Sequence, residues 1–127
     1  MYPSSYKYTQ EHEWVGPAKD DAVRVGLTDY AQKQLGDVVF VELPKVGDVF
    51  KAGDPVGTIE SVKAVSEVYA PVAGKVVAIN EDLNDSPEDI NEDAHATWLV
   101  EIKMSDPKEL KGLLTADQYE AYIAEQG

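Results

Sequence analysis

Apolar and polar residues alternate over short stretches of the chain, and turns rich in glycine and proline separate these stretches. Alternation with a period of two residues predicts β-strands, in which successive side chains point to opposite faces of a sheet. Strands are predicted in the segments EHEWV, DAVRVGL, DVVFVELP, PVGTIESV, AVSEVYA, GKVVAIN and TWLVEIKM. Short strands at this spacing are typical of a small β-sandwich or barrel.

One predicted strand, DVVFVELP, has an apolar face and a polar face. Val38, Phe40 and Val41 are expected to form its apolar side, and Asp37 and Glu42 its polar side. We therefore expect Phe40 to point into the core.

The predicted strands also contain a weak internal repeat. The segments VGDVFKAGDPVGTI and APVAGKVVAIN each combine a glycine-containing turn with a β run, which hints at two similar halves that meet at ESVKAV. Gly74 ends the tight turn APVAG and is predicted to need a positive φ, which glycine adopts without steric cost.

Helices are predicted between some strands and after the last one. Thr28 is a predicted cap for DYAQKQL, which Gly36 ends, and Ser86 is a predicted cap for one helical turn in SPEDIN. Two further helices are predicted in DPKELKGLL, after Asp106, and in TADQYEAYIAEQ, after Thr115. Their apolar stripe contains Leu110, Leu113, Leu114, Tyr119, Tyr122 and Ile123.

The predicted elements make a mainly β fold with C-terminal helices. The chain has 127 residues and 43% hydrophobic residues, which suits one domain with one core. We expect residues 1–127 to form a single domain, with a β core over about 8–104 and a helical segment over about 105–126.

Composition and terminal sequence limit the compartment. No run of eighteen apolar residues is present, so no membrane span or membrane partner is expected. The first residues lack the apolar centre of a signal peptide. A cytoplasmic location is the expectation, or a mitochondrial one if a transit peptide has been removed.

Charge and cysteine content narrow the possible chemistry. The formal net charge is −13, which disfavours nucleic acid as a partner and favours either simple solubility or partners with basic surfaces. Cysteine is absent, so any sulfur chemistry requires sulfur on an attached group.

Familiar metal and catalytic motifs are absent or incomplete. The acidic segment NEDLNDSPEDINED has Pro87 where a calcium loop of the EF-hand type needs glycine, so a solvated loop is predicted there. HEW lacks the second histidine of a zinc helix, and neither GxSxG nor GxxxxGK occurs. No metal site is predicted.

Lys63 lies at a predicted hairpin tip of unusual composition. Tight hairpins favour glycine at the tip, but this one reads Val62-Lys63-Ala64. A solvated surface lysine is one interpretation. The other is an amine presented to an acylating enzyme, with the flanking carboxylates Glu60 and Glu67 as recognition marks.

The chain resembles the H-protein family of the glycine cleavage system, whose members are lipoyl carriers. The resemblance rests on YTQEHEWV, GLTDYAQKQLGDVVFVELPKVGD, ESVKAVSEVYAPVAGKVVAIN, SPEDINED and WLVEIKMSDPKEL, which together span nearly the whole chain. It implies a barrel-sandwich hybrid, with lipoate in amide linkage to Lys63. The lipoate would supply the two sulfurs that the sequence lacks.

The resemblance also implies a role and partners. The family's protein has no turnover of its own. It carries the aminomethyl group of glycine from glycine decarboxylase (P protein) to aminomethyltransferase (T protein), and then electrons to dihydrolipoyl dehydrogenase (L protein). A lipoyl ligase or lipoyl transferase would attach the cofactor, and we expect a monomer.

In this family the loaded arm folds back into a cleft of the carrier. The matching positions here are Glu13, Gln34 and Glu67. Glu13 is the best candidate for a hydrogen bond to the amine of the arm, because a carboxylate forms a charge-assisted bond. Its alternative is an ordinary solvated strand residue.

Two segments depart from the family pattern. The turn GPAKDD is a residue longer than usual, and residues 94–97 read AHAT where many relatives have a Tyr-Gly-x-Gly segment. Three other functions stay open at this point: a lipoyl or biotinyl domain of another complex, an unmodified acidic interaction module, and a relay that donates lipoate to other enzymes.

Overall fold

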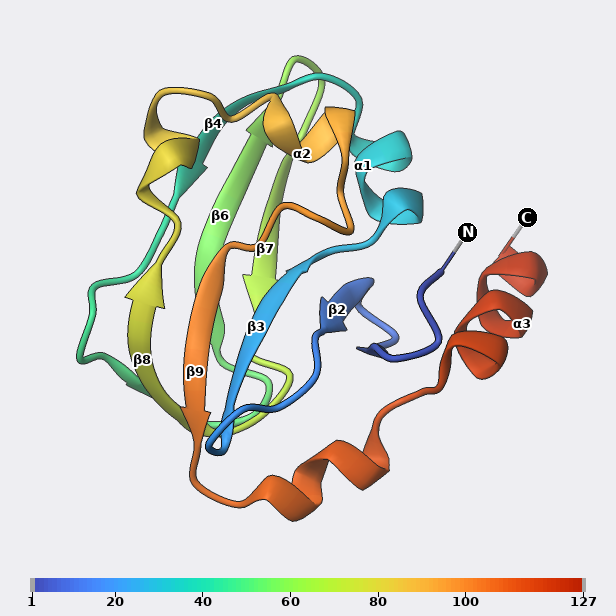
Figure 1. Ribbon diagram of the computed structural model, residues 1–127. Helices are drawn as coiled ribbons and strands as arrows, with labels where there is room; N and C mark the ends of the chain where they lie inside the picture. Colours follow the sequence, from blue (N-terminus) through green and yellow to red (C-terminus); the bar gives the residue numbers. More distant parts are fainter. Residues whose placement is uncertain (1, 127) are drawn as a thin grey trace.

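Two antiparallel β-sheets form the body of the molecule, in a computed structural model that describes residues 2–126 (Figure 1). The larger sheet has the strand order β1-β2-β3-β9-β8-β5, with the bounds Lys7–Tyr8 (β1), Glu13–Val15 (β2), Ala22–Leu27 (β3), Val100–Met104 (β9), Gly74–Ile79 (β8) and Val49–Phe50 (β5). The smaller sheet has the order β4-β6-β7, with the bounds Val38–Glu42 (β4), Pro55–Ser61 (β6) and Val65–Tyr69 (β7).

Among residues 2–126, five helices connect or follow these strands. Their bounds are Asp29–Leu35 (α1), Glu81–Asn84 (η1, a 3₁₀ helix), Asp89–Glu92 (α2), Pro107–Gly112 (η2, also 3₁₀) and Ala116–Gln126 (α3). Within residues 2–126, no helix has the length and apolar character needed to cross a membrane.

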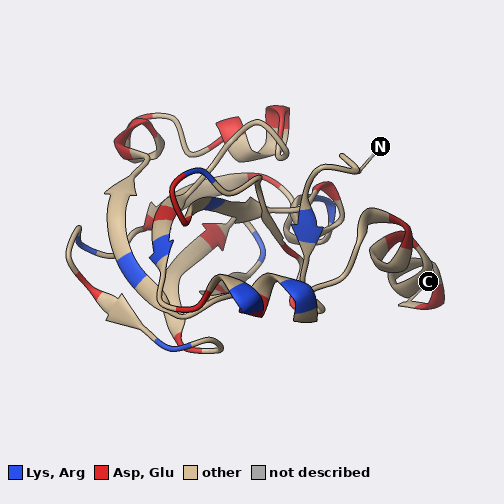
Figure 2. Ribbon diagram, turned by 60° about the horizontal axis from the view of Figure 1, so that its bottom comes forward, with Lys and Arg blue, Asp and Glu red and all other residues tan. Residues whose placement is uncertain are grey.

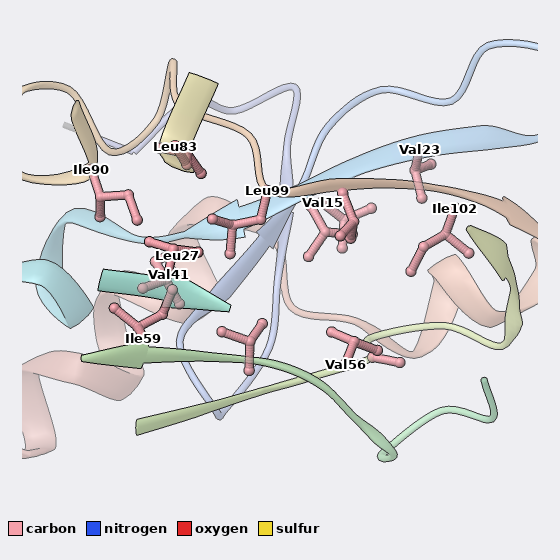
Figure 3. Packing of buried hydrophobic residues seen from close by; sticks show 14 of the residues in the cluster. Val15, Val23, Leu27, Val41, Val56, Ile59, Leu83, Ile90, Leu99 and Ile102 are labelled. Atoms are coloured by element: carbon pink, nitrogen blue, oxygen red, sulfur yellow. The ribbon is translucent and has the colours of Figure 1, made fainter. Parts of the chain in front are cut away.

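The inward side chains of the two sheets form one apolar core (Figure 3). The larger sheet contributes valines and isoleucines from β2, β3 and β9, and the smaller sheet contributes them from β4, β6 and β7. Burying a side chain of this size stabilises the fold by roughly 1.5–3 kcal/mol. The core therefore fixes the position of the smaller sheet, from which the β6–β7 hairpin projects.

The predicted strands are confirmed in position, but the predicted alternation in β4 is wrong at Phe40. Val38 and Val41 are buried, whereas Phe40 is 51% exposed. The pairing of β4 with β6 shifts register between Val38 and Phe40. Such a β-bulge adds a residue to one strand, so that Val39 and Phe40 both face outward.

The helix caps are largely as predicted. The Thr28 hydroxyl accepts a hydrogen bond from the Ala31 N–H, and Gly36 ends α1 with φ +81°. Asp106 caps η2, which is a 3₁₀ helix. Thr115 and Gln118 form a reciprocal capping box at the start of α3, because each side chain accepts from the other residue's backbone N–H.

The acidic segment after β8 differs from its prediction. The helical turn predicted in SPEDIN is confirmed as α2, but the rest of the segment was expected to be a solvated loop. Instead η1 also forms, and the two helices place Leu83 and Ile90 in the core. Ser86 is not the helix cap, because α2 begins after Glu88 without a side-chain cap. The apolar residues at two positions of an otherwise acidic segment decide its structure.

A second, aromatic cluster joins the two ends of the chain. Tyr8 and Trp14 from the N-terminal strands pack with Tyr119 of α3 and are all buried. The Tyr119 hydroxyl hydrogen-bonds His12 Nδ1 (2.8 Å) and Thr28 Oγ1 (2.7 Å). This network docks α3 against the N-terminal strands and the start of α1.

Gly74 is required for a reason other than the predicted positive φ, since its φ lies outside the left-handed region. A Cβ at Gly74 would lie 2.1 Å from the Lys103 carbonyl oxygen, on the paired strand β9. We expect Gly74→Ala to lower the free energy of unfolding by about 2–3 kcal/mol, because the strands must separate locally.

Urea unfolding measures this loss. Gly112→Ala is the matched control, because nothing lies within 4 Å of a Cβ added at Gly112. Equal unfolding midpoints for Gly74→Ala and Gly112→Ala would show that the close approach does not constrain β8.

Candidate functional site

The β6–β7 hairpin closes its tip without glycine by means of Ser61. The Ser61 N–H donates to the Ala64 carbonyl (2.8 Å), and the Ser61 hydroxyl oxygen accepts from the Ala64 N–H (3.1 Å). A serine hydroxyl can substitute in this way for part of a backbone turn. Ser61 therefore explains why the tip Val62-Lys63-Ala64 holds its shape.

The hairpin tip is fixed to the segment that follows α1. The Val62 N–H donates to the Asp37 carbonyl (3.0 Å). The Lys63 side chain passes over Gly36, where a Cβ would lie 3.4 Å from Lys63 Cε. Gly36 ends α1 with φ +81°, and the aliphatic part of Lys63 lies beside it.

Asn91 of α2 braces this segment from the other side. Its Oδ1 accepts from the Val38 N–H (2.8 Å), and its Nδ2 donates to the Gly36 carbonyl (2.9 Å). Nδ2 also donates to Gln32 Oε1 of α1 (3.0 Å). Asn91 belongs to the predicted turn SPEDIN, but no local pattern reveals its role, because its partners are more than fifty residues away.

Lys63 is exposed at this braced tip. Among the described residues, neither Glu60 nor Glu67 forms an ion pair with it. Glu60 is partly buried in β6, and Glu67 is exposed in β7. Acidic residues are spread over much of the ribbon, as Figure 2 shows, in keeping with the net charge of −13.

The remaining predicted site residues lie in three different environments. Glu13 is only 1% exposed, which excludes the alternative interpretation of a solvated strand residue. Its carboxylate accepts from the Thr9 hydroxyl (2.7 Å) and from the Tyr69 N–H (2.9 Å). The nearby Glu67 charge raises the pKa of the Tyr69 phenol, so Glu67 and Glu13 are both neighbours of Tyr69. Gln34 is exposed on α1.

The Glu13 carboxyl has unusual electrostatics because of its burial. Desolvation raises its pKa more than the hydrogen bonds from Tyr69 and Thr9 lower it, so the pKa rises from the ordinary 4.5 to about 7. Since the Tyr69 N–H belongs to the last residue of β7, Glu13 joins the larger sheet to the base of the hairpin.

Comparison with known proteins identifies the family. A family model described as Glycine cleavage H-protein matches residues 6–126. The chain belongs to the glycine cleavage H-protein family. It is therefore a member of a family of lipoate-carrying subunits that work with the other proteins of the glycine cleavage system.

Individual H proteins are similar over nearly their whole lengths. The chain is 54% identical to the glycine cleavage system H protein of Bacillus licheniformis over 97% of each chain. It is 51% identical to that of Koribacter versatilis over 98% of this chain and 96% of the relative.

A solved structure confirms the predicted fold class. The crystal structure of a glycine cleavage system H protein from Mycobacterium marinum matches with a TM-score of 0.86 at 37% identity, over 97% of this chain and 99% of that one. The chain therefore has the predicted barrel-sandwich fold with C-terminal helices.

The loop that departs from the family pattern is well ordered by hydrogen bonds. The Trp14 indole N–H donates to the Ala94 carbonyl (3.0 Å), and the Tyr6 hydroxyl donates to the His95 carbonyl (2.9 Å). His95 Nε2 also accepts from the Asp29 N–H at the start of α1 (3.1 Å). The loop without glycines thus connects α1 to the N-terminal aromatic cluster.

The brace at Asn91 leads to a first prediction about this site. Asn91→Ala removes the partners of the Val38 N–H and the Gly36 carbonyl, so we expect the free energy of unfolding to fall by about 2 kcal/mol. Amide hydrogen exchange at Val62 should also accelerate, because the Asp37 carbonyl loses its fixed position. Asn84→Ala, at an exposed position in η1, is the control. Unchanged exchange at Val62 would show that Asn91 does not brace the tip.

The burial of Glu13 leads to a second prediction, about stability and pH. Its folded pKa of about 7 lies above the ordinary 4.5, so the folded protein keeps a proton that the unfolded chain releases. The Glu13 contribution to stability is therefore complete below about pH 4.5 and is lost as the pH rises to about 7. The total loss is roughly 3 kcal/mol.

Urea unfolding of wild type and Glu13→Gln across this pH range isolates the effect, because the other titrating groups are common to both. Wild type should lose stability relative to Glu13→Gln as the pH rises. Glu11→Gln, at an exposed neighbouring position, should parallel wild type. A constant difference between wild type and Glu13→Gln would rule out the raised pKa.

Proposed function

We propose that the chain is the lipoyl carrier of the glycine cleavage system and that lipoate is attached in amide linkage to Lys63. The observation that carries this proposal is the exposed lysine on a hairpin tip fixed by Ser61 and by the Asp37 carbonyl. The residues present fit the group, because Lys63 is exposed and its amine forms no ion pair among residues 2–126.

The proposed role is transport between enzymes. The chain carries the aminomethyl group of glycine from glycine decarboxylase to aminomethyltransferase, and then electrons to dihydrolipoyl dehydrogenase. Lipoate supplies the two sulfur atoms for this chemistry, which a chain without cysteine lacks. The protein frame holds the attachment point still, so each transfer takes place at high effective concentration.

The surface of the chain suits several successive partners. A net charge of −13 favours association with enzymes that present basic patches, and charge complementarity speeds such encounters. We propose that a lipoyl ligase or lipoyl transferase first modifies Lys63, and that the chain then serves the three enzymes as one monomeric, non-catalytic domain in the cytoplasm.

The buried carboxyl of Glu13 supports a role in receiving the arm. An isolated buried carboxylate is costly, and an ammonium group beside it would lower that cost. We propose that Glu13 accepts a hydrogen bond from the amine carried by the arm, with Gln34 and Glu67 as further polar contacts. The neighbourhood of Glu13, Tyr69 and Glu67 supports this assignment.

Replacement of the lysine tests the proposed function. We expect Lys63→Arg to melt at the wild-type temperature but to incorporate no lipoate, because a lipoyl ligase acylates an amine and the arginine guanidinium offers none. Reconstituted glycine cleavage with the purified partner enzymes should be abolished. Lys75→Arg, at an exposed lysine on β8, should remain active. Lipoate incorporation into Lys63→Arg would place the modified residue elsewhere.

A further inference from the structure

Three large apolar side chains are exposed around Lys63. Phe40 on β4 is 51% exposed, Val62 at the hairpin tip is 70% exposed, and Val65 at the start of β7 is 66% exposed. We call these three residues the outer strip. Each leaves half or more of its surface in water, and none belongs to the buried core.

The strand register places Phe40 and Val65, the two strand residues of the outer strip, on one face. Phe40 pairs with Glu60 across β4 and β6, and Glu60 pairs with Val65 across β6 and β7. Directly paired residues of antiparallel strands point to the same side of a sheet. The neighbouring row contains Val41 and Ile59, which are buried, so the row of Phe40 and Val65 faces away from the core.

Carboxylates lie beside the strip on the same face. Glu60 stands between Phe40 and Val65, and the next outward row pairs Glu42 with Thr58 and Thr58 with Glu67. An apolar strip bordered by acidic residues fits a partner surface that is apolar at its centre and basic at its rim. A second copy of this chain would present like charges and is disfavoured.

We propose that the outer strip is the docking surface for the enzyme that acylates Lys63. This inference rests on the proposed function and names the contact on which the first modification depends. The enzyme supplies lipoate with an activated carboxyl group. The Lys63 amine attacks that carbonyl carbon, the amide C–N bond forms, the activating group leaves with the bonding electron pair, and the nitrogen loses a proton.

Reach distinguishes this enzyme from the later partners. An extended lysine places its amine only roughly 6 Å from its Cα, so the acylating active site must come into contact with the hairpin itself. Val62 and Val65 flank Lys63 in sequence and must then lie in the interface. Enzymes that act at the far end of the attached arm reach their target without covering the strip.

The double variant Phe40→Thr/Val65→Thr tests the proposal, because threonine keeps the β-branched shape suited to strands and removes apolar surface. With purified lipoyl ligase, ATP and lipoate, we expect kcat/KM for attachment to fall about tenfold, mainly through a higher KM. After complete lipoylation, the rate with dihydrolipoyl dehydrogenase should change less than about twofold. The control Val46→Thr/Val49→Thr alters equally exposed valines outside the strip and should match wild type in both assays.

The outcomes separate the two proposals. Attachment to the double variant at the wild-type rate, or an equal fall in both assays, would overturn the docking surface while leaving the carrier function intact. Failure of wild type to accept lipoate at Lys63 would overturn both. If the double variant melts below wild type, Val62→Thr and Val65→Thr replace it singly, with the same expected split between the two assays.

Discussion

The hydrogen bond from the Val62 N–H to the Asp37 carbonyl is the contact on which the site depends. The pairing of β6 with β7 ends at Glu60 and Val65, so the tip beyond it needs a further contact to hold its position. The bond ties the tip to a segment that Asn91 holds by two backbone contacts and that ends α1 at Gly36. The Lys63 side chain therefore projects from a fixed point on the protein surface.

The base of the same hairpin is held by a different residue. Glu13 accepts a hydrogen bond from the Tyr69 N–H at the end of β7. The larger sheet is therefore bonded to the hairpin at the end opposite to Lys63. This contact requires a buried carboxyl with a raised pKa, which lowers stability near neutral pH. A buried carboxyl that lowers stability and titrates near neutral pH is a candidate for a functional role. We assign Glu13 the role of binding a cationic group.

The parts predicted from sequence are those set by local chemistry. Thr28, Gly36 and Thr115 act on neighbours within a few residues, so their caps follow from the order of residues alone. Lys63 was found because its hairpin lacks the glycine that tight turns favour, and the family resemblance gave that lysine its chemistry.

The missed features depend on contacts between distant residues. Phe40 faces outward because a bulge interrupts the alternation, and the sequence shows no sign of the extra residue. Asn91 gains its role from partners across more than fifty residues, and Gly74 is constrained by the carbonyl of Lys103 on the neighbouring strand. The burial of Glu13 likewise depends on how the N-terminal strands pack against β7.

Peptide mass spectrometry of the chain purified from its native host shows directly whether Lys63 carries lipoate. We expect the peptide containing Lys63 to carry lipoate in amide linkage and the peptides containing the other lysines to be unmodified. A peptide in which Lys63 is unmodified or biotinylated, or lipoate found on another lysine, would contradict this expectation.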